Sequence, residues 1–392
     1  MPNGNLLGIF VSRILKLTVK RDVNIIKIVT IPFCIHTIII FAGVFLSNSL
    51  PVREATGFIN PSVTGQPLFI EKFIKWDAHW YTFIAEYGYD SQSIVFFPAI
   101  ILLIKGLAGL GISYVTAGFI LCNVFTMISY CLMAKTFLLD FSARETRLAL
   151  LAYAVMPTAF FLNSVYTEPV FIVFSLACLY CIRSGSWWSA GWFAALAAMT
   201  RSLGILLAVV LLAEYVRYYK NVRQLRTAMA SLLFPIIAVA AFCVYNHIMF
   251  GDWLAFVHSQ QLWGRRFGLP WENFRNNLQL IGAGVPLTEA GVYLDALLVA
   301  LAFVALVAAS TLPRYRLPAP YLITGWLWFL VPMFSTSPVY PLYSMARFVI
   351  VILPVYLFLA RLPSALFYSL ACLSAAGLLF CTAWFLNWYW LG

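Results

Sequence analysis

Long apolar segments repeat along almost the whole chain and are separated by short polar connections. They cover residues 26–47, 113–134, 148–162, 169–182, 187–200, 203–216, 228–249, 291–311, 319–335, 347–360 and 364–386. A helix that crosses a bilayer needs about 20 apolar residues. The pattern therefore predicts an all-α polytopic membrane protein with about 11 transmembrane helices, in one integral membrane domain over 1–392.

Charge places the two long connections, 48–112 and 250–290, on the outer side. Within the first, the run 94–112 is interrupted by Pro98 and Lys105, and we place it in the membrane interface. If it crossed the bilayer, the basic connection 135–147 would face outward, against the positive-inside rule. The basic residues predicted inside include Arg13, Lys16, Lys20, Arg21, Lys27, Lys135, Arg144, Arg147, Arg183, Arg217, Lys220, Arg223 and Arg226.

Composition narrows the function. Apolar and aromatic residues make up 63% of the chain and charged residues only 10%, whereas soluble domains carry about 25% charged residues. This excludes a soluble enzyme, a disordered protein and a nucleic-acid-binding module, and the net charge of +11 marks cytoplasmic loops instead. The chain also has no phosphate-binding glycine loop and no Asp-x-Asp pair, so a nucleotide-dependent pump or nucleotide-sugar enzyme is disfavoured. We expect no cofactor and no firm metal site.

The first outward loop contains a segment that reads as one amphipathic helix over 71–88, lying along the membrane surface. Aromatic residues repeat on one face of this helix, and Asp77 falls inside that apolar stripe. His79 falls on the polar face, where solvent is expected. A carboxylate in a semi-dry cavity suits a general base. Two structural alternatives remain open: Asp77 pairs with an arginine from another element, or the helix is shorter.

Further charged residues occur in apolar surroundings. Arg201 interrupts the otherwise uncharged run 187–213, which predicts two short helices that meet near it and line a hydrated cavity. Glu168 precedes Pro169 at a helix start, where a carboxylate suits the helix dipole. Arg347 begins a late apolar run, and Arg265 follows Trp263 in the second outward loop. Arginines near a dry carboxylate suggest chemistry on a phosphorylated lipid.

These residues lie in segments that resemble the PIG-V type of mannosyltransferase and its shorter bacterial and archaeal relatives. The segments, in family order, are WDAHWYTFIAEYGYD (76–90), FFP (96–98), PTAFFLNSVYTEP (157–169), TRSLG (200–204), FGDWLAFVHSQQLWGR (250–265) and SMARF (344–348). The resemblance implies a GT-C fold, with interfacial helices in the first outward loop and Asp77 as the catalytic base. By position, it places the following residues around the substrates: Trp76, His79, Tyr166, Glu168, Arg201, Trp263, Arg265 and Arg347.

The resemblance also implies the reaction. Such an enzyme takes a sugar, here mannose by preference, from a polyprenyl-phosphate carrier and inverts its anomeric centre. The acceptor is expected to be a lipid or an envelope glycan, and no nucleic acid takes part. The active site is expected on the non-cytoplasmic face of the plasma membrane, or of the endoplasmic reticulum in a eukaryote.

A lipid-linked oligosaccharide flippase, or another secondary transporter, is the alternative from a different class. Transporter sites also use broken helices, as predicted around Arg201. Such a protein should have paired halves, however, and the second half of the chain has no matching broken segment. A non-catalytic scaffold is a third possibility, and it predicts no charge within apolar faces.

Overall fold

The computed structural model describes residues 24–218 and 229–392, and most of these residues are helical. The α-helices are α2 (Ile25–Ser47), α3 (Leu68–Lys72), α4 (Asp77–Tyr87), α5 (Pro98–Ala108), α6 (Tyr114–Leu138), α7 (Ala143–Ala154), α8 (Glu168–Ser184), α9 (Trp187–Thr200), α10 (Leu207–Tyr218), α12 (Leu233–Phe250), α13 (Ala255–His258), α14 (Pro270–Gly282), α15 (Ala290–Thr311), α16 (Ala319–Met333), α17 (Met345–Val349), α18 (Leu353–Leu359) and α19 (Ser364–Leu386). Short 3-10 helices are η1 (Pro61–Val63), η2 (Ser93–Val95), η3 (Ala159–Leu162), η4 (Ser202–Leu206), η5 (Ala230–Leu232), η6 (Ser259–Trp263) and η7 (Leu287–Glu289). The strands are β1 (Arg266–Phe267) and β2 (Ser335–Thr336).

Among the described residues, five helical segments are long and apolar enough to cross a membrane, which makes the chain an integral membrane protein. They are Ile25–Ser47, Tyr114–Leu138, Ala230–Phe250, Leu287–Thr311 and Ser364–Leu386. The sequence predicted about 11 such helices, but several of the predicted spans form shorter helices, such as α7, α9 and α18. The doubtful run 94–112 contains α5, whose 11 residues extend only about 17 Å. That length is too short for a hydrocarbon core about 30 Å thick.

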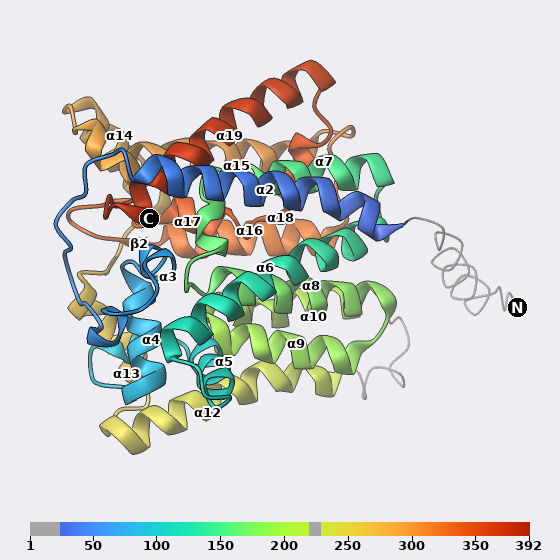
Figure 1. Ribbon diagram of the computed structural model, residues 1–392. Coiled ribbons are helices and arrows are strands. Elements are labelled where there is room, and N and C mark those ends of the chain that lie inside the picture. Colours follow the sequence, from blue (N-terminus) through green and yellow to red (C-terminus); the bar gives the residue numbers. More distant parts are fainter. Residues whose placement is uncertain (1–23, 219–228) are drawn as a thin grey trace, which may run out of the picture.

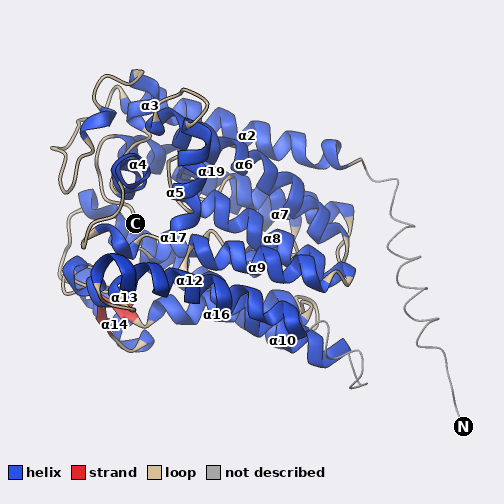
Figure 2. Ribbon diagram, turned by 90° about the horizontal axis from the view of Figure 1, so that it is seen from below, coloured by secondary structure: helices blue, strands red, loops and turns tan. Residues whose placement is uncertain are grey.

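The long helices lie side by side, and the short elements of the two long connections gather at one end of them (Figure 1). The C-terminus lies at this same end, close to α3, α4 and α17. The two strands form a single antiparallel pair beside α14 (Figure 2), in which Arg266 faces Thr336 and Phe267 faces Ser335. This pair ties the 250–290 connection to the end of α16.

The predicted single helix over 71–88 is wrong, because the chain breaks between α3 and α4. Trp76 adopts φ 52° and ψ −118°, a backbone conformation that residues other than glycine rarely adopt. Asp77 is consequently the first residue of α4 and does not lie in the middle of a continuous apolar stripe. The helix is also packed within the protein, since His79, Trp80 and Tyr81 are buried. A shorter helix was one of the alternatives that the sequence left open.

The predicted helix break near Arg201 is confirmed. Helix α9 ends at Thr200, Arg201 is extended with φ −154° and ψ 148°, and η4 follows before α10 begins. Gly204 allows this turn, because a Cβ atom there would lie only 2.2 Å from the backbone of Ala197. The predicted inward positions of Arg13, Lys16, Lys20, Arg21, Lys220, Arg223 and Arg226 lie outside the described residues.

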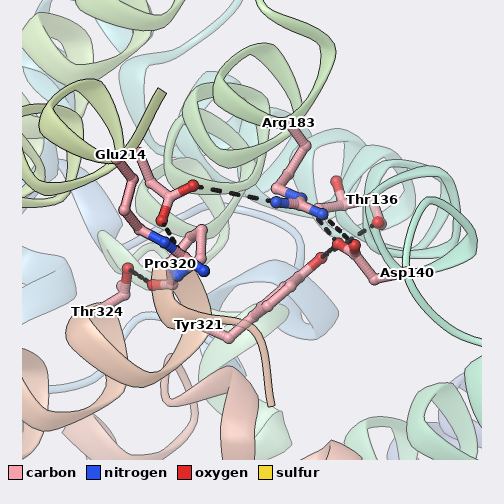
Figure 3. Close-up of polar contacts among 8 residues, drawn as sticks. Thr136, Asp140, Arg183, Glu214, Pro320, Tyr321 and Thr324 are labelled. Atoms are coloured by element: carbon pink, nitrogen blue, oxygen red, sulfur yellow. Dashed lines mark hydrogen bonds and ion pairs between the residues drawn. The ribbon is translucent and has the colours of Figure 1, made fainter. Parts of the chain in front are cut away.

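A cluster of charged residues joins four helices at the end of α8 that lies away from Glu168 (Figure 3). Arg183 donates to Asp140 through Nε at 3.0 Å and lies 4.0 Å from Glu214. Tyr321 donates to the same aspartate at 3.1 Å, and Arg217 pairs with Glu214 at 2.9 Å. The connection after α6 and the start of α8 therefore lie at opposite ends of α8.

Candidate active site

A cavity of about 590 Å³ lies among the connecting segments at the end of the bundle that holds α4 and α17. Six of the nine residues chosen from the sequence line it: Trp76, Asp77, Arg201, Trp263, Arg265 and Arg347. They come from α4, the break before η4, the second long connection and α17, so the fold brings together segments that are far apart in the chain. Glu168, Tyr166 and His79 lie behind this wall.

Arg347 links two carboxylates. Its Nη1 atom lies 2.5 Å from Asp77 Oδ2, and its Nε atom lies 2.5 Å from Glu168 Oε1. The pairing of Asp77 with an arginine from another element was one of the structural alternatives. It does not remove Asp77 from the cavity, whose wall that residue forms.

Arg201 completes the charged group from the other side. Its Nη1 atom lies 2.5 Å from Glu168 Oε1, so one carboxylate oxygen serves both arginines. Glu168 is fully buried, as the first residue of α8, and Arg201 is only 8% exposed. Removing one partner from a buried ion pair is strongly destabilising. The two arginines and the two carboxylates, Asp77 and Glu168, balance in charge.

The two carboxylates differ in their access to a substrate. The Asp77 side chain is 19% exposed and lines the cavity, whereas the Glu168 side chain is completely buried. Glu168 is therefore placed to hold the two arginines, and Asp77 is placed to meet a bound molecule.

A buried aspartate that the sequence analysis missed supports Arg347. Asp295, in α15, accepts a hydrogen bond from the backbone N–H of Ala346 at 2.5 Å. The chain enters α17 through Tyr343 and Ser344, which have φ values of 31° and 69°. This contact anchors the first turn of the short helix that carries Arg347. No local pattern indicates it, since the two residues are about 50 positions apart.

His79 and Tyr166 support the site from behind the cavity. The prediction that His79 is solvated is wrong, because it is buried and its Nδ1 accepts from the backbone N–H of Asn60 at 3.1 Å. Burial, together with the charge of Lys75, lowers the pKa of His79 to about 4, so the imidazole is neutral at pH 7. Tyr166 donates to the Lys75 carbonyl at 3.2 Å, and its ring centroid lies 4.8 Å from the Arg347 guanidinium.

Trp263 and Arg265, from the second long connection, also line the cavity. The Trp263 indole N–H donates to the Gln92 carbonyl at 3.0 Å, which joins the two long connections. The Arg265 guanidinium lies 4.7 Å from the ring centroid of Tyr343, and the Tyr343 hydroxyl donates to the Trp263 carbonyl at 3.2 Å. The second connection is thus fastened to the segment that leads into α17.

Two residues that line the cavity also have a buried polar atom without a partner in the described part of the chain. The indole N–H of Trp76 and the hydroxyl of Thr167 are buried, and both residues line the cavity. Buried polar groups are normally hydrogen-bonded, so these two atoms beside the cavity have unused hydrogen-bonding capacity. Within the described residues, no three His, Cys, Asp or Glu side chains gather closely enough to hold a metal ion.

Comparison with known proteins identifies the kind of enzyme. Searches of curated proteins and of solved structures found no match. A family model matches more than half of the chain, including α4, Glu168 and Arg201, but it stops before Arg347. Because residues 33–260 match the family described as mannosyltransferase (PIG-V), the chain belongs to that family and is a membrane glycosyltransferase.

Proposed function

We propose that the protein transfers mannose from a polyprenyl-phosphate carrier to a hydroxyl group of a lipid or glycan acceptor, with inversion at the anomeric carbon. The observation that carries this proposal is the cavity in which one accessible carboxylate, Asp77, lies beside two arginines that share a buried counter-ion. The family makes the chain an enzyme, so the transporter alternative is not retained.

The arginines account for recognition of the donor phosphate. Arg201 and Arg347 both line the cavity, and the planar guanidinium group matches the geometry of phosphate oxygens. Glu168 holds the two side chains but leaves part of their hydrogen-bonding capacity unused, because an arginine has five donor hydrogens. A phosphate therefore binds without the loss of the buried ion pairs.

An apolar rim offers a place for the polyprenyl chain. Val331 and Phe334, at the end of α16, line the cavity and are 43% and 39% exposed. Phe267 in β1 is 77% exposed and stacks on Phe334 with ring centroids 5.7 Å apart. This rim supports entry of the lipid donor from the bilayer, with its phosphate directed toward the arginines.

The proposed chemistry is a single displacement. Asp77 accepts the proton of the acceptor hydroxyl, and the hydroxyl oxygen forms a bond to the anomeric carbon of mannose. The bond from that carbon to the phosphate oxygen breaks, and polyprenyl phosphate leaves with the electron pair. Arg201 and Arg347 stabilise the charge that develops on the leaving group. Attack opposite the leaving group produces inversion.

We place this reaction on the non-cytoplasmic face of the membrane, because the charge asymmetry puts both long connections there. Trp76 and Thr167 are the groups that we assign to the sugar hydroxyls, since their buried polar atoms have no other partner in the described part of the chain. Arg265 and Trp263 form the side of the cavity that we assign to the acceptor.

The test is transfer by the purified protein in liposomes. It is supplied with polyprenyl-phosphate mannose of known anomeric configuration and with lipid extracts as acceptors, and the products are followed by mass spectrometry and NMR. We expect mannosylated lipid, free polyprenyl phosphate and an inverted anomer. Asp77→Asn is the inactive control, and Glu54→Gln, which changes an exposed carboxylate that does not line the cavity, is the active one. A retained anomer, or transfer from a nucleotide sugar alone, would contradict the proposal.

A further inference from the structure

The last residues of the chain form part of the cavity wall, although they lie far from the family-matched region in sequence. Trp390 lines the cavity, and the residue after it, Leu391, is only 1% exposed. A Cβ atom on Gly291 of α15 would lie 3.0 Å from the Trp390 carbonyl oxygen. The segment 388–392 is thus packed tightly between the cavity and α15.

Trp388 contacts the residues that flank Asp77. Its ring stacks on His79 with centroids 5.5 Å apart and an interplanar angle of 15°. The Lys75 ammonium lies 4.8 Å from the centroid of the same ring, and the Trp76 ring meets it edge-on at 5.4 Å. One side chain from the end of the sequence therefore touches three residues between 75 and 79.

Trp390 holds the other side of Trp76. The two ring centroids are 4.9 Å apart with an interplanar angle of 84°, and the Trp390 ring also stacks on Tyr340 at 6.0 Å. The Trp76 ring consequently contacts two tryptophan rings. Trp76 is also the residue with φ 52° that directly precedes Asp77. A strained backbone conformation persists only where the surrounding structure holds it in place. The rings of Trp388 and Trp390 are positioned to hold Trp76 in this way.

The segment 388–392 also packs against α17, the helix that carries Arg347. A Cβ atom on Gly392 would lie 3.5 Å from Arg347 Cβ and 3.4 Å from the Phe161 ring. Residues 388–392 therefore pack against Arg347 and against residues that flank its partner Asp77.

We infer that residues 388–392 form a strap that fixes the position of Asp77 through Trp76, with Trp390 as the central positioning residue. The inference rests on the proposed function, because it assigns the strap to the transfer reaction. It adds the segment 388–392 to the parts of the active site that lie outside the region 33–260 matched by the family model, and it makes this segment a determinant of the catalytic rate.

Kinetics with three variants test this inference. Trp390→Ala removes the ring, Trp390→Phe keeps an aromatic edge, and Trp192→Ala is the control, because Trp192 is 60% exposed on α9 and contacts Phe234 away from the cavity. Misplacing a catalytic group by about an ångström costs up to 10²-fold in rate. We expect Trp390→Ala to lower kcat by about 10- to 100-fold with little change in donor KM, and Trp390→Phe to recover most of the rate.

A combination with Asp77→Asn separates positioning from a general structural effect. If Trp390 acts through Asp77, then Trp390→Ala should lower the residual rate of Asp77→Asn by less than about twofold, because residues that act as a unit are non-additive. A full additional loss in the double variant, or a wild-type kcat in Trp390→Ala, would overturn the inference.

Hydrogen exchange provides a readout that needs no transfer. Backbone amides of residues 73–80 should exchange faster in Trp390→Ala than in the wild type, whereas Trp390→Phe and Trp192→Ala should leave them unchanged. Unchanged exchange in Trp390→Ala would refute the strap. If the wild type transferred no mannose, the proposed function would fail, and the exchange experiment alone would decide whether residues 388–392 hold this turn.

Discussion

Replacing Asp77 by asparagine removes one negative charge from the cavity wall and keeps the shape of the side chain. The amide oxygen can still accept the hydrogen bond that Arg347 Nη1 donates at 2.5 Å. Arg347 also keeps its contact with Glu168, so no buried cation is left without a partner. The side chain at position 77 is 19% exposed, and we therefore expect the variant to fold and purify as the wild type does.

The expected loss is catalytic. General-base catalysis contributes about 10²- to 10⁴-fold, which corresponds to about 2.7–5.4 kcal/mol at 1.36 kcal/mol per tenfold. The paired charges of the site no longer balance in Asp77→Asn, and the excess is positive. Donor phosphate should therefore bind at least as tightly as in the wild type, while transfer falls below about one per cent of the normal rate.

Glu168→Gln provides the matched comparison, because this carboxylate is buried between two arginines. Breaking a buried pair costs about 3–5 kcal/mol, a large part of the 5–15 kcal/mol that stabilises a typical protein. We expect a poorly folded protein with weak donor binding. The assay measures donor affinity, the thermal midpoint and mannose transfer for both variants. Transfer above one tenth of the normal rate by purified Asp77→Asn would refute Asp77 as the base.

Three further outcomes are expected. Arg201→Lys should keep partial activity and Arg201→Ala almost none, because lysine lacks the planar fork; equal donor affinity in the wild type and Arg201→Ala would contradict a phosphate contact. Burial lowers the pKa of Lys75 from 10.5 to about 8, so the unfolded chain binds more protons between these values and stability rises with pH there. The thermal midpoint of the wild type, measured relative to that of Lys75→Met, should therefore rise between pH 7.5 and 9.5. A difference between the two midpoints that does not change with pH would contradict this. In a cysteine-free background, an impermeant thiol reagent should label Val52→Cys from outside but not Arg147→Cys, both of which are exposed positions, and the reverse pattern would invert the proposed topology.

The sequence was sufficient to find the charged centre of the site. Three charged residues lie in apolar stretches of the sequence: Arg201, Glu168 and Arg347. A charge in such surroundings is energetically costly and is usually functional. Their segments also resemble a known family. The break at Arg201 followed from the same reasoning, because a buried charge and a broken backbone both need a hydrated cavity.

The sequence did not reveal how these residues are held. The break at Trp76 has no local signal, since tryptophan is not a residue that favours a positive φ. The rings that pack against Trp76 belong to Trp388 and Trp390, which are more than 300 positions away. The same break explains the wrong prediction that His79 faces solvent. Helical periodicity predicts which face a residue lies on only as long as the helix is continuous. The anchor that Asp295 provides for Ala346 is another long-range contact of this kind.

Helix α8 is held by ion pairs at both of its ends, so its length is fixed by two sets of partners. Glu168, in its first turn, pairs with Arg201 and Arg347, and Arg183, in its last turn, pairs with Asp140. Both charges also suit the helix dipole. The 17 residues of α8 extend about 25 Å, and an inserted residue would advance one end by about 1.5 Å and rotate it by about 100°. Both anchors could not then be satisfied together. This helix should consequently tolerate many apolar replacements along its length but no insertion or deletion.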